Sequence, residues 1–519
     1  MPTHKGDFVN LGNVVRYWSH YNPDGVAVVN VDRSVTWSQL HERTSRLANG
    51  LASLGLTKGD RVGILSGNCL EYLEVAIAGF KLGTILVPLN VRLTPHELRY
   101  IIEHAGCRAL VADEHLAPLG AEALDHSALP VDRIGMGEGF GVTLYSLRSD
   151  DATDPDAPVE GGDVTYICYT SGTTGTPKGA MLTHGGLLAM ATGKMLSNDT
   201  SRASRVYLPF PLSFTGGIVS VWVPAYLAGS TLVLDPIVDP LLMLQQIQNQ
   251  RLTHFAAVPL IFEMMLQHPD FSKYDLSSLQ VVGSGGAAVP ESLIERLQAV
   301  GIPMAQGYGL TESCGQNTWL HERDSRRKIG SCGKPMMQTR IRTVDPENHD
   351  ALVDVPVGDV GELIIKGPEV MIGYWNAPEA TAETLVDGWL RTGDLARIDD
   401  EGYIYIVDRA KDMLISGGLN VYPAEIEFVL AAMPGVAECA VIGVPDRKWG
   451  ETPVALIRPM PGATIDKAMV LAHCREQLAD YKLPRYIVVR DEPLPRGMSG
   501  KVLKRELRSE YASLGTPAG

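Results

Sequence analysis

Apolar and polar residues alternate with two different periods along the first part of the chain, and each period predicts one kind of element. Residues 38–56 and 71–83 place apolar side chains at helical spacing, and Gly55 and Gly83 lie at the ends of these segments. Short apolar runs at 60–66 (DRVGILS) and 85–90 (ILVPLN) predict buried strands. Alternating strands and helices are typical of a layered α/β domain with largely parallel sheets.

The alternation continues to about residue 300. Residues 231–234 predict a strand followed by a helix near 240–250, and residues 254–259 precede a further helix. Residues 279–298 (LQVVGSGGAAVPESLIERLQ) predict a strand, a glycine turn and then a helix with Pro290 in its first turn. This pattern extends the α/β prediction well beyond the first 150 residues.

The pattern changes in the last third of the chain. Short strand-like pieces appear near residue 360, and after residue 410 helices are expected near 423–432 and 466–479. Residues 408–411 close a strand with charges that cannot continue a core, so we place the main boundary there. The predicted fold class is α/β and α+β, with a large N-terminal layered α/β domain over 1–410 and a small C-terminal α+β domain over 411–519.

One long stretch, residues 206–234, contains no charged residue and must be compared with a membrane span. A spanning helix needs roughly 20 predominantly apolar residues. Prolines, glycines and hydroxyl side chains interrupt this stretch, and they divide it into strand, turn, short helix and strand. A buried segment that lines a pocket is therefore favoured over a transmembrane segment.

Composition and charge narrow the class of protein. A chain of 519 residues with 45% hydrophobic and 20% charged residues is typical of a folded protein with two or more domains. The net charge of −15, which divides into −16 for residues 1–410 and +1 for residues 411–519, argues against nucleic acid or an anionic membrane as a partner. Seven scattered cysteines without C-x-x-C spacing and an N-terminus without an apolar core favour the cytoplasm.

The clearest chemical signal is the loop at 169–179 (YTSGTTGTPKG), which follows the strand-like run 163–168. Small residues allow backbone N–H groups to reach an anion, so this loop is a candidate phosphate site. It is not a Walker A loop, because Pro177 stands where a glycine should precede the lysine and Gly179 where Ser or Thr should follow. An ordinary surface turn is the alternative, and the density of hydroxyls disfavours it.

Three further glycine turns carry a weaker signal when each is taken alone. Residues 283–286 (GSGG), 306–312 (QGYGLTE) and 416–418 (SGG) are each compatible with an ordinary tight turn. Lys501, in the turn SGK near the end of the chain, could equally be a solvated charge. The order of these segments along the chain is more informative than any one of them.

Taken together, the motifs YTSGTTGTPKG, QGYGLTES, LRTGDLA, DRAKDMLISGG and PRGMSGK resemble the successive core motifs of the acyl-adenylate-forming superfamily. This family comprises acyl- and aryl-CoA synthetases, adenylation domains and firefly-type luciferases. The resemblance covers nearly the whole chain, and ISGGLNVYPAEIE with YKLPR looks most like bacterial fatty-acyl- and aryl-CoA ligases.

The resemblance implies a two-step reaction. A carboxylate attacks the α-phosphate of ATP to give an acyl-adenylate and pyrophosphate, and the thiol of coenzyme A then displaces AMP. It also implies Mg²⁺ and a cation, because an anionic nucleophile must approach a polyanion. The expected partners are a carboxylic acid, ATP and coenzyme A, with no nucleic acid and no transmembrane segment, and a homodimer is left open.

The resemblance also implies residue roles for the nucleotide. Lys501 would neutralise the α-phosphate and the acid carboxylate, Thr311 would bind the α-phosphate, and Glu312 with Thr170 would hold Mg²⁺. Tyr308 would stack on adenine, while Asp394 and Arg409 would fix the ribose. The remaining nucleotide residues are Ser171, Gly172, Thr173, Thr174, Gly175, Lys178, Gly285, Gly286, Ala287, Gln306, Gly307 and Gly309, of which the 171–175 loop would clamp the leaving pyrophosphate.

For the second step, the family places a hinge at Lys411, about which the small, mobile C-terminal domain would rotate between two poses. One pose would deliver Lys501, and the other would form the pantetheine channel. The expected contacts to coenzyme A are Ser416, Gly417, Gly418, Trp449, Tyr481 and Arg485.

The expected acid pocket contains small or apolar residues and no charge. Phe214 replaces a histidine that many relatives carry beside the carboxylate, which makes that end of the pocket more apolar, and Leu419 replaces a glutamate. An apolar acid, such as a medium- or long-chain fatty acid, is therefore favoured over acetate or an amino acid. The pocket residues are Phe214, Thr215, Gly216, Gly217, Trp222, Val258, Pro259, Gly283, Ser284, Gly285, Gly307, Cys314, Gly315 and Gln316.

Three functions remain open from the sequence. The first is a free-standing acid–CoA ligase, and the second is an adenylating enzyme that loads a carrier protein in trans. The third is a nucleotide-binding protein of the same fold without catalysis, which the presence of Glu312, Asp394, Arg409 and Lys501 disfavours. The product formed with coenzyme A or with a carrier protein distinguishes the first two.

Overall fold

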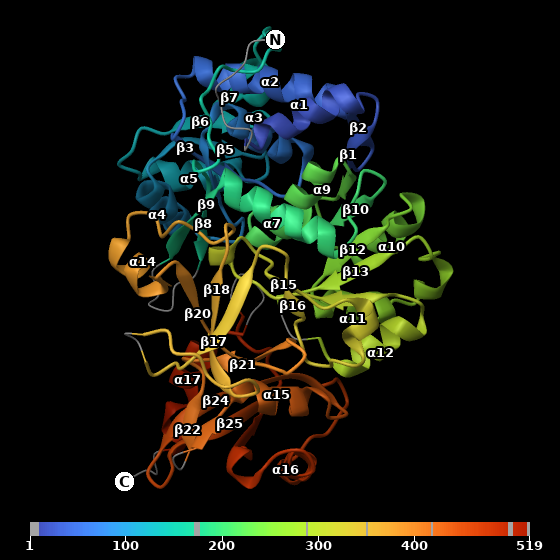
Figure 1. Cartoon of the computed structure of the whole chain (residues 1–519), viewed down its shortest axis with the longest axis vertical. Coiled ribbons are helices and arrows are strands. Elements are labelled where there is room, and N and C mark those ends of the chain that lie inside the picture. Colours follow the sequence, from blue (N-terminus) through green and yellow to red (C-terminus); the bar gives the residue numbers. More distant parts are fainter. Residues whose placement is uncertain are drawn as a thin grey trace.

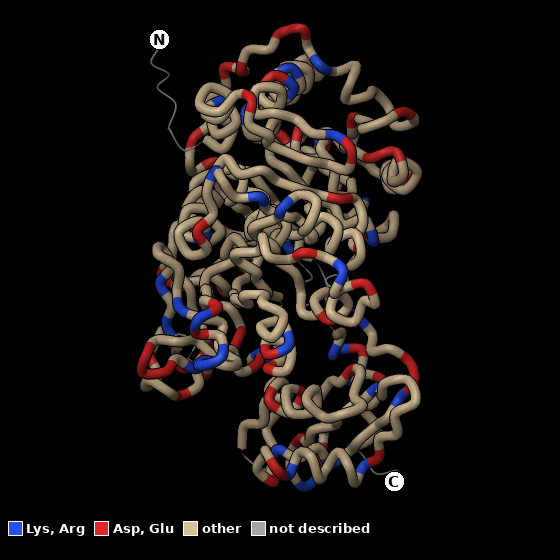
Figure 2. Tube along the Cα trace, turned by 90° about the vertical axis from the view of Figure 1, so that its right-hand side faces the viewer, with Lys and Arg blue, Asp and Glu red and all other residues tan. Residues whose placement is uncertain are grey.

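The computed structural model describes residues 10–170, 177–286, 289–348, 351–416, 419–496 and 502–515. The predicted class is confirmed: a large N-terminal α/β part is followed by a smaller C-terminal part. Figure 1 shows the smaller part, coloured orange to red, at one end of the long axis, and Figure 2 shows it as a lobe.

The first sheet is built mainly from parallel strands near the N-terminus. Its strands pair in the order β7 (Val142–Thr143), β6 (Asp132–Gly135), β5 (Cys107–Ala112), β3 (Arg61–Leu65), β4 (Ile85–Pro88), β8 (Val164–Thr170) and β9 (Lys178–Thr183). Only the β8–β9 pairing is antiparallel among these described pairs. The helices of this region are α1 (Gly12–Tyr21), α2 (Trp37–Ser53), α3 (Leu70–Leu82), α4 (Pro95–Ala105), α5 (Ala117–Asp125) and α6 (Leu144–Leu147).

The second sheet is also mainly parallel. Its order is β14 (Met304–Gln306), β13 (Val281–Ser284), β12 (His254–Ala257), β10 (Arg205–Leu208), β11 (Thr231–Leu234), β1 (Val26–Asn30) and β2 (Arg33–Thr36). Its helices are α7 (His184–Ser197), α8 (Thr215–Gly217), the π-helical turn η1 (Ile218–Trp222), α9 (Val223–Ala228), α10 (Pro240–Asn249), α11 (Pro259–Gln267) and α12 (Glu291–Ala299). Pro290 caps α12 rather than lying in its first turn, because its extended backbone precedes the helix.

The predictions for individual elements are largely confirmed. The helices expected at 38–56 and 71–83 are α2 and α3, and the strands expected at 60–66 and 85–90 are β3 and β4. The uncharged stretch at 206–234 divides into β10, the helix formed by α8, η1 and α9, and β11. In the described part of the chain, no helix has the length and apolar character that crossing a membrane requires.

A single apolar core joins the two sheets. Val62 and Tyr166 of the first sheet and Val28 and Leu232 of the second belong to one contiguous buried cluster. Helix α3 lies inside it and is apolar apart from Glu71, Glu74 and Lys81, and nearly all of its residues are buried. The helix ends at Gly83, whose φ of +79° suits glycine.

Smaller sheets follow in the last third of the chain. A short sheet pairs β15 (Thr318–Trp319) with β16 (Lys334–Pro335), and the next pairs β17 (Arg340–Val344), β18 (Val360–Lys366), β20 (Trp389–Ile398), β19 (Leu385–Val386) and β21 (Ile404–Arg409). The C-terminal sheet pairs β23 (Leu419–Val421), β22 (Leu414–Ser416), β25 (Gly450–Pro459), β24 (Val436–Asp446) and β26 (Tyr486–Val489). The helices here are α13 (Glu322–Ser325), α14 (Pro378–Thr384), α15 (Pro423–Ala431), α16 (Lys467–Arg475) and α17 (Lys504–Tyr511).

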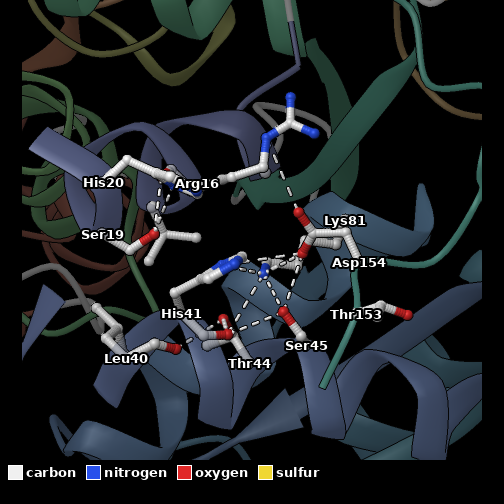
Figure 3. A network of polar contacts seen from close by, with 12 residues as sticks. Arg16, Ser19, His20, Leu40, His41, Thr44, Ser45, Lys81, Thr153 and Asp154 are labelled. Carbon is white, nitrogen blue, oxygen red and sulfur yellow. Dashed lines mark hydrogen bonds and ion pairs between the residues drawn. The ribbon is translucent and has the colours of Figure 1, made fainter. Parts of the chain in front are cut away.

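A buried lysine on α3 ties the N-terminal helices together, as Figure 3 shows. Lys81 is 4% exposed, and its Nζ reaches Asp154 Oδ1 at 2.5 Å and Ser45 Oγ at 2.7 Å. His41 Nδ1 lies 2.9 Å from the same nitrogen. Burial lowers the pKa of Lys81 to about 8, while the carboxylate of Asp154 opposes that shift. The ammonium is therefore held in the core by its carboxylate partner.

We predict that Lys81→Met destabilises the protein by about 3 kcal/mol, because Asp154 then lies partly buried without its partner. Urea unfolding of the purified variant measures the change in the free energy of unfolding. Lys81→Met with Asp154→Leu removes both charges and should recover most of the loss. An unchanged midpoint for the single variant would contradict the role assigned to the pair.

Candidate functional site

The first part of the site joins the loop after β14 to strand β20. Tyr308 OH donates to Asp394 Oδ2 at 2.6 Å, and Arg409 Nε lies 3.1 Å from Asp394 Oδ1. Asp394 and Arg409 are directly opposite each other in the β20–β21 ladder, which explains their contact. Burial, followed by the negative charge of Asp394, raises the pKa of Tyr308, so the phenol stays protonated and donates.

Glycines bring the backbone of this loop into close contact. A Cβ on Gly309 would lie 1.4 Å from the carbonyl oxygen of Gly315, and one on Gly307 would lie 2.1 Å from Gln316 Nε2. Gly315 itself has a φ of +90°. The loop can close only because these positions carry no side chain.

The second part of the site is a 3₁₀ turn that carries two polar side chains. Glu312 Oε1 accepts from Tyr374 OH at 2.9 Å and from Thr170 Oγ1 at 3.5 Å. The hydroxyls of Thr311 and Thr215 lie 2.9 Å apart. Because β8 ends at Thr170 and β14 ends at Gln306, these groups gather at the carboxyl ends of strands in both sheets.

Glu312 and Thr170 fit a divalent cation that also binds phosphate. A carboxylate and a hydroxyl meet at one point, and Mg²⁺ is usually held by one or two carboxylates together with substrate phosphates and water. Across the described ranges, no three His, Cys, Asp or Glu side chains form a metal cluster. A cation here would therefore take most of its ligands from phosphate and water.

Several predicted nucleotide residues lie beside this centre, and others cannot be placed. Lys178 is the first residue of β9, and its Nζ lies 5.4 Å from the centre of the Tyr374 ring. Gly285 and Gly286 follow β13, and Gly286 has a φ of +80°. The predicted residues Ser171, Gly172, Thr173, Thr174, Gly175, Ala287, Gly417, Gly418 and Lys501 lie outside the described residues.

In the C-terminal part, two of the residues predicted to bind coenzyme A meet. The guanidinium of Arg485 lies 4.4 Å from the centre of the Trp449 ring. Tyr481 is exposed nearby in sequence, with Lys482 Nζ 5.6 Å from its ring. Ser416 is buried at the end of β22, opposite Gly450 in the ladder. The half-buried Trp449 ring and the exposed Arg485 guanidinium form a surface suited to an aromatic, phosphate-bearing ligand.

The predicted hinge at Lys411 lies between two sheets. Strand β21 ends at Arg409 and β22 begins at Leu414, so four residues connect them. Burial, followed by the charge of Arg409, lowers the pKa of Lys411. Across this connection, Arg508 donates to Asp412 at 2.6 Å, and the amide of Ala424 donates to Asp408 at 2.8 Å.

The predicted acid-pocket residues divide between two places. Gly283 lines a cavity of about 30 Å³ between α7, η1, β12, β13 and Trp319. Thr215 and Cys314 are buried near Thr311, whereas Phe214 and Val258 are half-buried. Trp222 stacks on Phe80 in the core, with ring centres 5.7 Å apart.

Sequence reasoning missed three residues of this region. Tyr374 is bonded to Glu312, and Lys194 and Ser220 line the cavity beside Gly283. A signal for Lys194 was present in the sequence. Leu187, Met190, Ala191 and Lys194 follow the i, i+3, i+4, i+7 spacing of one helical face, so the lysine lies on the buried face of α7.

We predict that Gly309→Ala destabilises the protein by more than about 1 kcal/mol, since the new Cβ would overlap the Gly315 carbonyl. Thermal unfolding measures the effect. Gly216→Ala is the matched control, because that helical glycine has no atom within 4 Å of an added Cβ. Equal melting temperatures for the two variants would contradict the proposed close contact.

Comparisons with known proteins agree on one family. The AMP-binding enzyme family matches residues 15–375, and the AMP-binding enzyme C-terminal domain matches residues 425–501. A feruloyl-CoA synthase of Amycolatopsis sp is 40% identical over 94% of this chain and 96% of that protein. The long-chain-fatty-acid–CoA ligase FadD13 of Mycobacterium tuberculosis is 37% identical over 97% of this chain and 99% of that protein.

A solved structure agrees with this assignment. The crystal structure of ATP-bound MatB from Rhodopseudomonas palustris superposes with a TM-score of 0.89 at 32% identity, covering 98% of this chain and 100% of that one. The chain therefore belongs to the AMP-binding enzyme family and is an AMP-forming acid–CoA ligase that uses ATP, Mg²⁺ and coenzyme A.

Proposed function

We propose that this ligase activates a carboxylic acid with an apolar body, alkyl or aryl, and that the centre around Tyr308 and Glu312 performs the adenylation. The observation that supports this most is the contact of Tyr308 and Arg409 with one buried carboxylate, Asp394, in the same loop system as Thr311 and Glu312. Each carboxylate oxygen of Asp394 has a further lone pair that can accept a ribose hydroxyl, and the Tyr308 ring offers a stacking surface for adenine.

In the first step, an oxygen of the acid carboxylate attacks the α-phosphorus of ATP, and the bond to pyrophosphate breaks. Thr311 would donate to the α-phosphate, while Thr215 beside it would orient the acid. Glu312 and Thr170 would hold Mg²⁺, which supplies positive charge against the phosphates. Lys501 would span the α-phosphate and the carboxylate, where negative charge from both reactants converges.

In the second step, the thiolate of coenzyme A attacks the acyl carbon, the C–S bond forms and AMP leaves. We assign the contact with coenzyme A to Trp449, Tyr481 and Arg485, with Ser416, Gly417 and Gly418 along the channel. The Arg485–Trp449 contact at 4.4 Å supports this, because it places an exposed cation beside a half-buried aromatic ring.

We also propose that residues 1–410 and 411–519 act as two domains that rotate about Lys411 between the two steps. Two observations support the boundary. The β17–β21 sheet ends at Arg409 and the C-terminal sheet begins at Leu414. The connection at residues 410–413 directly follows Arg409, which contacts Asp394. A rotation about this connection would therefore begin next to the proposed nucleotide site.

The acid itself is set by the pocket rather than by the relatives, whose names give different acids. The half-buried ring of Phe214 precedes Thr215, and buried Cys314 follows the 3₁₀ turn. These side chains favour an apolar body close to the reacting carboxylate. The small size of the cavity beside Gly283, about 30 Å³, favours a compact acid over a long chain.

We predict that Lys501→Ala lowers the rate of adenylation by about 100-fold or more, because an uncompensated charge develops at the α-phosphate. Pyrophosphate release measures this step. Thioester formation from a synthetic acyl-adenylate and coenzyme A should stay within a few fold of the wild type. Lys467→Ala, at an exposed position on α16, is the matched control and should leave both steps unchanged.

We further expect coenzyme A, rather than a carrier protein, to receive the acyl group. Purified enzyme is incubated with ATP, Mg²⁺ and a panel of alkyl and aryl acids, with coenzyme A or a phosphopantetheine-bearing carrier protein. Mass spectrometry of the products should show the CoA thioester. Acylated carrier protein in the absence of any CoA thioester would favour the second function.

A further inference from the structure

Helix α7 buries a lysine that has no carboxylate beside it. Lys194 is 6% exposed, and its Nζ donates to Gln316 Oε1 at 2.6 Å. The same nitrogen lies 3.7 Å from the centre of the Trp319 ring. Within the described ranges, no Asp or Glu oxygen lies within 4.0 Å of it. One neutral amide and one aromatic face are thus its only partners among those residues.

Lys81 provides the comparison inside the same molecule. It is equally buried, but Asp154 pairs with it, as Figure 3 shows. An ammonium group is costly to bury unless it is paired, and burial accordingly lowers the pKa of Lys194 to about 7 and that of Lys81 to about 8. A methionine or leucine would fill the place of Lys194 at no such cost, so packing alone does not account for it.

Lys194 lines the cavity of about 30 Å³, together with Ser220, His254 and Gly283. A cavity of this size holds one or two water molecules or one small polar group. His254 is occupied on both ring nitrogens, by Thr253 Oγ1 and by the carbonyl of Asn198, each at 2.9 Å. An ammonium carries three N–H groups, and Gln316 accepts only one of them.

The cavity is joined to the proposed acid site by close contacts. Gln316 accepts a hydrogen bond from Lys194 and also borders Gly307. A Cβ added at Gly307 would lie 2.1 Å from Gln316 Nε2. Gly315 borders Ser220 in the same way, with 3.0 Å between an added Cβ and Ser220 Oγ. The cavity therefore adjoins the proposed acid site, with Gly307 and Gly315 at the boundary between them.

The helix that runs from the reacting end to the cavity gives the distance between them. Thr215, at the reacting end, and Ser220, at the cavity, are five residues apart in one continuous helix formed by α8, η1 and α9. This spacing corresponds to about 7 Å along the helix axis. The separation matches the distance between the carboxylate of a compact acid and a substituent at its far end.

We propose that Lys194 determines specificity by donating a hydrogen bond to an oxygen at the far end of the acid. The substrate is then a compact acid with an apolar body and a second oxygen acceptor, about 7 Å from the reacting carboxylate. This inference rests on the proposed function, because it takes the acid to be activated beside Thr215 and Thr311. A hydroxyl, a carbonyl or a second carboxylate supplies the same chemistry.

A site built around a buried donor rejects a substrate that lacks the matching acceptor, because the donor then stays unpaired. We therefore expect an acid with the far oxygen to be used about 10- to 100-fold more efficiently than its unsubstituted analogue. Replacing Lys194 by Met removes the donor and keeps an unbranched side chain. The preference should then disappear, and the unsubstituted acid should be used at least as well as before.

The experiment measures kcat/KM for ATP-dependent pyrophosphate release with matched acids on two skeletons. The aryl set is 3-phenylpropanoate, 3-(4-hydroxyphenyl)propanoate and 3-(4-carboxyphenyl)propanoate, and the alkyl set is hexanoate, 6-hydroxyhexanoate and adipate. The enzymes are the wild type, Lys194→Met and the control Lys81→Met, which removes a buried lysine outside the cavity. The preferred member of each set distinguishes a neutral oxygen from a carboxylate.

The inference is supported if the wild type prefers an oxygenated acid, Lys194→Met loses that preference and Lys81→Met keeps it. It is overturned if the wild type prefers the unsubstituted acids, or if Lys194→Met keeps the wild-type ratio. If Lys194→Met does not fold, Lys194→Gln replaces it in the experiment. This variant should also reduce the ratio of kcat/KM for the oxygenated acid to that for the unsubstituted acid. Discrimination in pyrophosphate release without any CoA thioester would support Lys194 while refuting the second step of the proposed function.

Discussion

The buried carboxylate of Asp394 is the constraint on which the arrangement of the site depends. It receives the phenol of Tyr308 from the loop after β14 and the guanidinium of Arg409 from β21. The Tyr308 contact connects the second parallel sheet to the antiparallel sheet that precedes the C-terminal part, and the Arg409 contact lies within that antiparallel sheet. A carboxylate in a buried position needs such partners, so the two sheets are fixed relative to each other where the nucleotide is proposed to bind.

The main features of the fold follow from local sequence signals. Helices α2 and α3 and strands β3 and β4 were predictable because the spacing of their apolar residues matches the period of the element that each of them forms. The glycine loop at 306–312 was predictable as a site because Gly307 and Gly309 flank Tyr308, and both glycines prove to be required by close contacts. The assigned roles of Lys501 and of the 171–175 loop rest on the family resemblance, since those residues lie outside the described ranges.

Other features could not be predicted, because they depend on which distant segments meet. Tyr374 is far from Glu312 in sequence, and only the path of the chain after β18 brings the two together. Trp222 illustrates the opposite case: its place in an uncharged stretch suggested a pocket wall, whereas its ring stacks on Phe80 in the core. The helical spacing of α7 predicts that Lys194 lies on its buried face. The role proposed for this lysine depends on its having no nearby carboxylate among the described residues, which the sequence could not show.

The close contact between Gly309 and Gly315 has a consequence for how this enzyme could diverge. At this contact, the loop that carries Thr311 and Glu312 is closed by the backbone of Gly309 and Gly315, so this part of its shape does not depend on the side chains that surround the acid. Ser220 and Lys194 line the neighbouring cavity and not the proposed nucleotide centre, although Ser220 shares its helix with Thr215, which lies beside Thr311. Substitutions there can change the chosen acid while leaving the activation chemistry intact, so one scaffold can acquire new substrates by a few changes on α7 and the helix at 215–228.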